Sequence, residues 1–239
     1  MSESLDPFAP PTAEPQDPRA WQDADTGASF LPPRRAVVAA LWVFSVVCVL
    51  KMLGLANQIR VIGDRSVTFE ELVMSDNITG PLDGVYLVVL LVTLVLWGMW
   101  AHRAASNLRA IRPGWGYEFT PSAHVWWYFV PFANLVKPYH AMRELVFATL
   151  GSLDPGPRTQ TLGAWWGAWV TGNILGNVAN RLMPDSTRVT GEAYFDRLTW
   201  ASLADMASSA ALVVAALVAV RIIRDVNAHQ VMRRTREVL

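Results

Sequence analysis

The chain has 239 residues, of which 52% are hydrophobic and 17% are charged. Soluble domains carry about 25% charged residues, so this composition favours a surface that faces lipid. Lys and Arg total 20, as do Asp and Glu, which leaves no net charge to attract nucleic acid. The single cysteine, Cys48, excludes an internal disulfide and a cysteine-based zinc cluster.

The first segment, residues 1–33, holds 7 of the 15 prolines and several acidic residues, with few apolar ones. Such a segment buries too little apolar surface to offset the entropy cost of ordering, so we expect a disordered, acidic, Pro-rich cytoplasmic tail. It lacks the basic start and apolar core of a signal peptide. No repeated P-x-x-P pattern marks it as a docking sequence, so an inert tail is the favoured interpretation.

Four apolar segments follow, and each is long enough to cross a bilayer as a helix, which takes about 20 residues. We predict spans at about residues 36–56, 82–101, 161–181 and 199–223. The polar stretches 57–81 and 182–198 are expected outside the membrane, with a capping box at Thr68 opening a short surface helix. Lys51, near the end of the first span, is expected to extend to the interface.

The third predicted span carries a helical stripe of small residues. Small residues recur every four positions, at Ala164, Ala168, Gly172 and Gly176. Such a stripe allows a second helix to approach closely, so it predicts a contact with another copy or another membrane protein.

Polar residues form a candidate intramembrane cluster of Asn173, Asn177, Arg181 and Asp205. The two asparagines are expected to hydrogen-bond between helices, with a binding role as the alternative. Asp205 lies about two turns inside the last span, where a lone carboxylate is costly unless it is paired. Arg181 is its expected partner, and a proton-linked or ion-linked role is the alternative.

The central segment is aromatic and broken by prolines. The apolar run at residues 125–133 is too short to span a bilayer, so residues 122–134 are expected to be re-entrant or interfacial. Pro131 interrupts any helix there. An amphipathic helix on the cytoplasmic face is predicted at residues 135–150, with Asn134 as its cap and Gly151 as its end.

Cations and aromatic residues converge at this cytoplasmic end. The candidate contacts for an anionic lipid or another anion are Arg103, Asn107, Arg109, Trp126, Trp127, Lys137 and Arg143. The alternative is that the cations pair with Glu144, with helix C-termini and with phospholipid in general. Most of the 20 basic residues fall on the side of both termini, so the positive-inside rule places both termini in the cytoplasm. Residues 226–239 are then a basic cytoplasmic tail.

Several sequence pieces resemble a bacterial membrane protein family known as domain of unknown function 4328. The pieces are H-R-A-A-S-N-L-R-A at 102–110, P-G-W-G-Y-E-F-T-P at 113–121, V-W-W-Y-F-V-P-F-A-N-L-V-K-P-Y-H-A-M-R-E-L at 125–145 and W-W-G-A-W-V-T-G-N-I-L-G-N at 165–177. The resemblance implies a multi-pass protein of the bacterial cell membrane. It implies no activity and no catalytic residue.

The expected fold class is all-α. It is a polytopic membrane bundle of four transmembrane helices with a proline-broken re-entrant or interfacial segment and an amphipathic cytoplasmic-face helix. The favoured function is a non-enzymatic scaffold or regulator that binds membrane partners or anionic lipid. The alternative is a small carrier or channel with a polar path near Asn173, Asn177 and Asp205.

Catalysis is not expected. The chain has no H-E-x-x-H, G-x-S-x-G or phosphate-binding glycine loop. Its four histidines are scattered, and none forms a ligand pair at helical spacing. We therefore predict no catalytic residue, no cofactor, no metal site and no nucleic-acid partner.

Overall fold

A computed structural model describes residues 34–64, 69–150, 156–185 and 191–237. The expected tail at residues 1–33, the capping residue Thr68 and the expected helix end at Gly151 lie outside these ranges. Within them the chain is helical and has no strand, which confirms the all-α fold class. The described helices belong to one compact unit, Pro32–Leu239.

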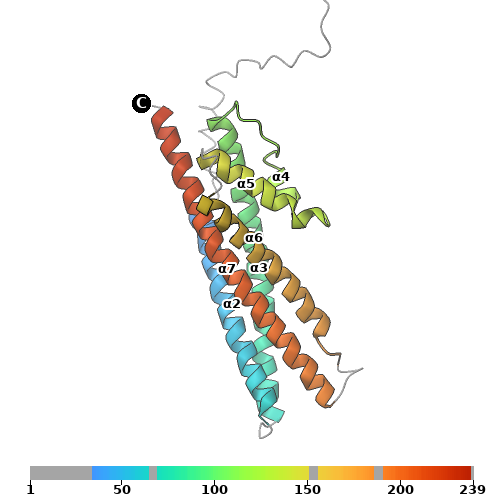
Figure 1. The fold of residues 1–239 in the computed structure, drawn as a ribbon. Helices are drawn as coiled ribbons and strands as arrows, with labels where there is room; N and C mark the ends of the chain where they lie inside the picture. Colours follow the sequence, from blue (N-terminus) through green and yellow to red (C-terminus); the bar gives the residue numbers. More distant parts are fainter. Residues whose placement is uncertain (1–33, 65–68, 151–155, 186–190, 238–239) are drawn as a thin grey trace, which may run out of the picture. The chain divides into compact units, whose positions relative to one another are not determined.

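Four long helices form the bundle, namely α2 (Arg34–Gly63), α3 (Phe69–Ile111), α6 (Gly156–Leu182) and α7 (Glu192–Glu237). α7 packs along both α2 and α6, and α2 packs along α3 (Figure 1). α6 meets α3 through long side chains such as the Trp97–Trp165 pair, whose ring centroids are 5.4 Å apart. The seam between α3 and α6 is therefore less closely packed than the seams that α7 makes.

The long helices extend beyond the predicted spans. A helix begins directly after Thr68, as predicted, but it is not a separate short helix, because Phe69 begins α3, which continues through Pro81. A proline removes one backbone hydrogen bond, and the turns on both sides keep the rest of the ladder. The expected tail at residues 226–239 is also helical as far as Glu237, as part of α7. Val226 and Gln230 are buried there, so packing supports the helix beyond its apolar stretch.

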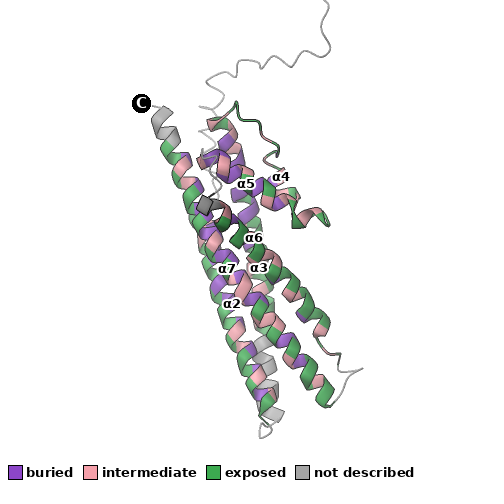
Figure 2. Cartoon of the chain, viewed as in Figure 1, coloured by how far each residue is buried: buried purple, intermediate pink, exposed green. Residues whose placement is uncertain are grey.

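Burial divides each long helix into an inner face and an outer face (Figure 2). The core joins residues of α2, α3, α5, α6 and α7, among them Phe44, Trp100 and Ile223. Large apolar side chains lie on the outside as well, for example Leu53 at 63% exposure and Val95 at 62%. An apolar exterior of this extent is costly in water and is the surface that a bilayer requires.

Short elements connect α3 to α6. They are α4 (Ala123–Trp126), the 3₁₀ turn η2 (Ala133–Leu135) and α5 (Lys137–Leu150). The predicted amphipathic helix is present, but it begins at Lys137, and Asn134 lies inside η2 instead of capping α5. α5 buries Met142 and Leu145 against the bundle and exposes Arg143. Phe132 has a φ of 61°, a strained conformation for an aromatic residue, at the bend before η2.

Candidate functional site

The most unusual polar feature is an ion cluster that joins three of the long helices. Lys51 Nζ of α2 lies 2.9 Å from Asp83 Oδ1 of α3 and 2.9 Å from Asp205 Oδ2 of α7. The Tyr86 ring covers the same ammonium, with Nζ 4.5 Å from the ring centroid. We call Lys51, Asp83 and Asp205 the ion cluster. It links the consecutive helices α2 and α3 to α7, the last helix of the chain.

One sequence prediction about this cluster is wrong. Lys51, which was expected to extend to the interface, is only 8% exposed and pairs with Asp83 and Asp205 of the neighbouring helices. Arg181 does not pair with Asp205, because Lys51 does, and Arg181 is exposed at the end of α6. The physical reason is helical phase. Lys51 follows Val47 and Cys48 at one-turn spacing on the buried face of α2, so its side chain enters the bundle.

The ion cluster opens into a polar cavity of about 370 Å³. Its walls come from α2, α3, α6 and α7, and we call it the polar cavity. The polar residues that line it are Lys51, Gln58, Asp83, Tyr86, Asn173, Asn177, Asn180, Ser202, Asp205 and Ser208. Ligand pockets of proteins are typically about 300–1,000 Å³, so this cavity has the volume of a small-molecule site.

The two predicted asparagines line this cavity together with Asp205, and they do not bind another helix. Asn173 Nδ2 donates to the Trp169 carbonyl and Asn177 Nδ2 donates to the Asn173 carbonyl, both at 2.8 Å within α6. Each amide nitrogen therefore uses one of its two N–H bonds on its own helix. The other N–H bond and the amide oxygen remain, so each side chain can still donate and accept at the cavity.

The small-residue stripe brings α6 close to α7 beside the cavity. A methyl group at Gly172 would lie 2.7 Å from Leu212 Cγ and 3.2 Å from the Ser208 carbonyl oxygen. Ser208 Oγ also donates to the Gly172 carbonyl at 2.7 Å. Of the four stripe residues, Gly172 and Gly176 face α7, whereas Ala168 is half-buried and Ala164 is exposed.

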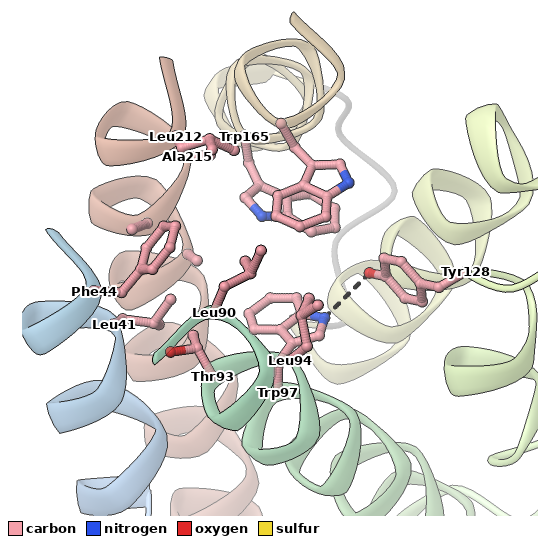
Figure 3. A pocket seen from close by; sticks show the side chains of 13 residues that line it. Leu41, Phe44, Leu90, Thr93, Leu94, Trp97, Tyr128, Trp165, Leu212 and Ala215 are labelled. Atoms are coloured by element: carbon pink, nitrogen blue, oxygen red, sulfur yellow. Dashed lines mark hydrogen bonds between the residues drawn. The ribbon is translucent and has the colours of Figure 1, made fainter. Parts of the chain in front are cut away.

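Two further hollows lie along the seam between α3 and α6. One has a volume of about 350 Å³, and its lining includes Asn134, Tyr128 and Phe129, together with the same Asn173 and Asn177. The other is an apolar space of about 50 Å³ among aromatic and aliphatic side chains (Figure 3). A hydrogen bond of 3.1 Å from Trp97 Nε1 to the Tyr128 hydroxyl ties α3 to the segment after α4 at this level (Figure 3).

At the opposite end of the bundle, the loop between α3 and α4 is fixed by backbone hydrogen bonds to two titratable side chains. Glu144 of α5 accepts from the Glu118 N–H at 2.6 Å and from the Phe119 N–H at 3.3 Å. The His124 ring nitrogens lie 3.0 Å from the Thr120 carbonyl and 3.1 Å from the Ala141 carbonyl. These contacts hold the loop against α5.

Burial dominates the protonation of His124. The two carbonyls and the nearby Glu144 favour the charged ring, but loss of water around it opposes that charge more strongly. The pKa of His124 therefore lies below its usual value, and the neutral ring is favoured. In the same loop, burial raises the pKa of Tyr117. The Tyr117 hydroxyl lies within hydrogen-bonding distance of two carbonyl oxygens at the end of α3.

The predicted anion contacts do not form one site. Arg109 donates to the Phe119 carbonyl at 2.9 Å, and Lys137 lies over the Phe119 and Trp127 rings at 5.4 and 5.7 Å. The other predicted contacts are dispersed: Arg143 is exposed over Phe147, Trp126 is 67% exposed, and Arg103 and Asn107 are half-buried on α3. Two of the predicted cations, Arg109 and Lys137, thus contact the loop around Phe119.

Sequence analysis missed Asp83 as a site residue. A usable signal was present, because Asp83 lies just inside the second predicted span and Lys51 lies near the end of the first. Consecutive antiparallel spans place those two positions at the same depth. In the described part of the chain, no group of three or more His, Cys, Asp or Glu residues is placed to hold a metal ion.

The class of protein follows from these helices. Among the described residues, three helical stretches are long and apolar enough to cross a membrane: Arg34–Gly63, Gly80–Ile111 and Glu192–Met232. With their apolar exterior, they indicate a helical membrane protein. Residues 63–228 match the family model "Domain of unknown function (DUF4328)", so the chain belongs to that family, as the sequence motifs indicate. Comparisons with curated proteins and with solved structures find no match.

Proposed function

We propose that the protein is a four-span carrier of the cell membrane that binds a small polar solute in the polar cavity. α6 is the fourth span in this proposal. It was not among the three apolar stretches, since Asn173, Asn177 and Asn180 lower its hydropathy. Its 27 residues extend for about 40 Å at about 1.5 Å per residue, and it packs along α7. With four spans both termini lie on one face, and in this proposal the excess of Lys and Arg on that side makes it the cytoplasmic face.

The observation that carries the proposal is the ion cluster at the wall of the polar cavity. Charged groups within membrane spans are costly and are typical of solute or ion pathways. A purely structural ion pair gains nothing from an adjacent cavity of about 370 Å³, because close packing would stabilise it better. Three asparagines of α6 and two serines of α7 line the same space, so together with the ion cluster polar groups from four helices converge on it.

The arrangement of the hollows supports transport rather than binding alone. Asn173 and Asn177 line both the polar cavity and the hollow of about 350 Å³ beside Tyr128. The second hollow lies next to the segment that prolines interrupt, and broken segments near a midplane site are a feature of carriers. In the proposed path, the solute passes the two amides when α6 moves relative to α3.

Solute flux into proteoliposomes tests this proposal. The panel contains a small ammonium, a small carboxylate and a small amide, each radiolabelled, with full-length protein in the vesicles. We expect saturable uptake of one class, and loss of most of that uptake in Asp205→Asn and Asn173→Ala. Asp196→Asn is the control, since Asp196 is an exposed carboxylate of the same helix. Saturable uptake that survives both cavity substitutions contradicts the proposal, as does the absence of uptake in every class.

A scaffold or regulator that binds anionic lipid is the second candidate. The observation that favours it is the exposure of Trp126, Phe129 and Phe132, at 67%, 72% and 88%, in the segment next to Lys137. Aromatic side chains of this kind prefer headgroup depth, and a neighbouring cation attracts lipid phosphate. Native mass spectrometry of the detergent-purified protein tests it. Retained phosphatidylglycerol that falls in Lys137→Gln and not in the control Arg60→Gln supports the lipid role, and equal retention contradicts it.

A further inference from the structure

We propose that the polar cavity selects a small primary ammonium ion, a monovalent cation with N–H donors. The inference rests on the proposed function and adds the class of solute. It follows from three properties of the cavity: the donors of Lys51 are already engaged, the ion cluster and the asparagines offer further acceptor oxygens, and the ion cluster has a net negative charge.

The ammonium group of Lys51 has three donor positions, and each faces a partner. Two meet carboxylate oxygens at 2.9 Å, and the Tyr86 ring covers the group at 4.5 Å. An anionic solute would have to displace a carboxylate or the ring to reach Lys51. The cluster therefore does not present its positive charge to the cavity.

Several acceptors remain in the cavity. Each carboxylate of the ion cluster uses one oxygen for Lys51, which leaves Asp83 Oδ2 and Asp205 Oδ1. Asn173 and Asn177 each use one of their two N–H bonds on their own helix, and their amide oxygens are further acceptors. The hydroxyls are also committed as donors, since Ser208 donates to the Gly172 carbonyl at 2.7 Å and Ser202 donates to Gln58 Oε1 at 3.1 Å.

Charge selects the same class of solute. The cluster contains one cation and two carboxylates, so one negative charge is unmatched among the cavity's charged residues. Arg181, the nearest predicted alternative, does not line the cavity. A cation in a partly enclosed site gains more from that charge than it does in water. An ammonium ion also offers several N–H donors to the carboxylate and amide oxygens.

Lys51 itself shows how these residues bind an ammonium group. Its own ammonium, bound to two carboxylates and an aromatic face, shows that the site accommodates an NH₃⁺ group. A free ammonium ion would bind on the cavity side of the same two carboxylates. Asp83 and Asp205 both line the polar cavity, and their side chains are 55% and 25% exposed, so neither carboxylate is sealed by Lys51.

The test compares three solutes of matched size: propylammonium, propionate and propionamide. Binding to full-length protein in lipid nanodiscs is measured by isothermal titration. We expect propylammonium to bind most tightly, and Asp83→Asn to weaken it by about tenfold, because a charge-assisted hydrogen bond is lost. Asp83 is the preferred substitution since it is the more exposed carboxylate, and Asn177→Ala is a second variant that leaves the ion cluster intact. Asp196→Asn is the control and should bind as the unmodified protein does.

Each outcome separates this inference from the proposed function. Tighter binding of propionate or propionamide overturns the ammonium assignment and leaves a solute site in place. If sodium competes for the site as well as propylammonium does, the site takes a cation without needing N–H donors, and the ammonium assignment is also overturned. Absence of binding for all of these probes overturns both proposals. Unchanged propylammonium affinity in Asp83→Asn and in Asn177→Ala places the ligand elsewhere and contradicts the assignment.

Discussion

Two regions of the bundle hold titratable side chains in different ways. In the ion cluster, Lys51 is matched by two side chains from other helices. Between α4 and α5, Glu144 and His124 are matched by the backbone of one loop and by the carbonyl of Ala141. The first region joins long helices through side chains, whereas the second fixes a loop through main-chain groups.

The difference shows which region can change its state. Side-chain ion pairs are broken and remade by rotamer changes and by a competing charge, without loss of helical structure. Backbone N–H and C=O groups that lose their partners must find others, so a loop held in this way resists change. The ion cluster is therefore the adaptable region, and the Glu144 region is the fixed support at the other end of the bundle.

The largest expected effect comes from removing the shared cation. Lys51→Met leaves Asp205 without its partner inside the bundle, and breaking a buried pair in this way costs about 3 kcal/mol. Thermal unfolding in detergent should show a marked fall in apparent Tm. The double variant with Asp205→Asn should recover part of it, because the unpaired charge is gone. Arg60→Met, on the exposed face of the same helix, is the control. An equal fall in its apparent Tm would show that the loss in Lys51→Met does not come from the ion cluster.

The next effect tests the wall of the polar cavity. Gly172→Ala places a methyl group against Leu212 and the Ser208 carbonyl, so α6 and α7 must separate, at a cost of about 1–3 kcal/mol. Gly167→Ala is the matched control, because a methyl group there meets no atom within 4 Å. The control should be neutral or slightly stabilising. Equal behaviour of the two variants would show that close approach at Gly172 contributes nothing.

A smaller loss is expected in the backbone-matched region. Glu144→Gln keeps one acceptor oxygen and loses the charge that strengthens two N–H bonds, so we expect a cost of about 1–2 kcal/mol. Hydrogen exchange of the Glu118 and Phe119 amides should increase with it. Glu118→Gln, whose side chain is 71% exposed and only 3.6 Å from Lys137, should have little effect. Unchanged exchange of these amides in Glu144→Gln would show that Glu144 does not hold the loop in place.

The smallest effect is a pH dependence from His124. Because its folded pKa lies below the ordinary value of 6.5, the unfolded state binds the proton first. The contribution of His124 is complete above about pH 6.5 and is lost as the pH falls towards the folded pKa. Apparent Tm should fall with acidification less steeply in His124→Gln than in the unmodified chain. His102→Gln, at an exposed position, should keep the original slope, and identical slopes in all three would contradict this role.

The apolar pattern was sufficient to predict the class of fold and the positions of the long helices. Hydropathy cannot set helix ends, which is why Phe69 and Val226 fell outside the predicted spans. The candidate residues Asn173, Asn177 and Asp205 do line one cavity. The predicted partner of Asp205 was wrong. Arg181 and Lys51 both lie at a suitable depth, and only the rotation of α2 about its axis decides which of them reaches Asp205. That rotation depends on packing between helices and cannot be predicted from a local sequence pattern.

α7 has one further consequence for the bundle. Asp205, in the ion cluster, and Gln230, which donates to the Ala104 carbonyl of α3 at 3.0 Å, lie on the same uninterrupted helix. At about 1.5 Å per residue they are separated by about 38 Å of helix axis. A helix of that length behaves as a stiff rod, so axial rotation at one end reaches the other. A rearrangement around Asp205 would therefore change the contact between Gln230 and α3 directly, without a conformational change in the loops.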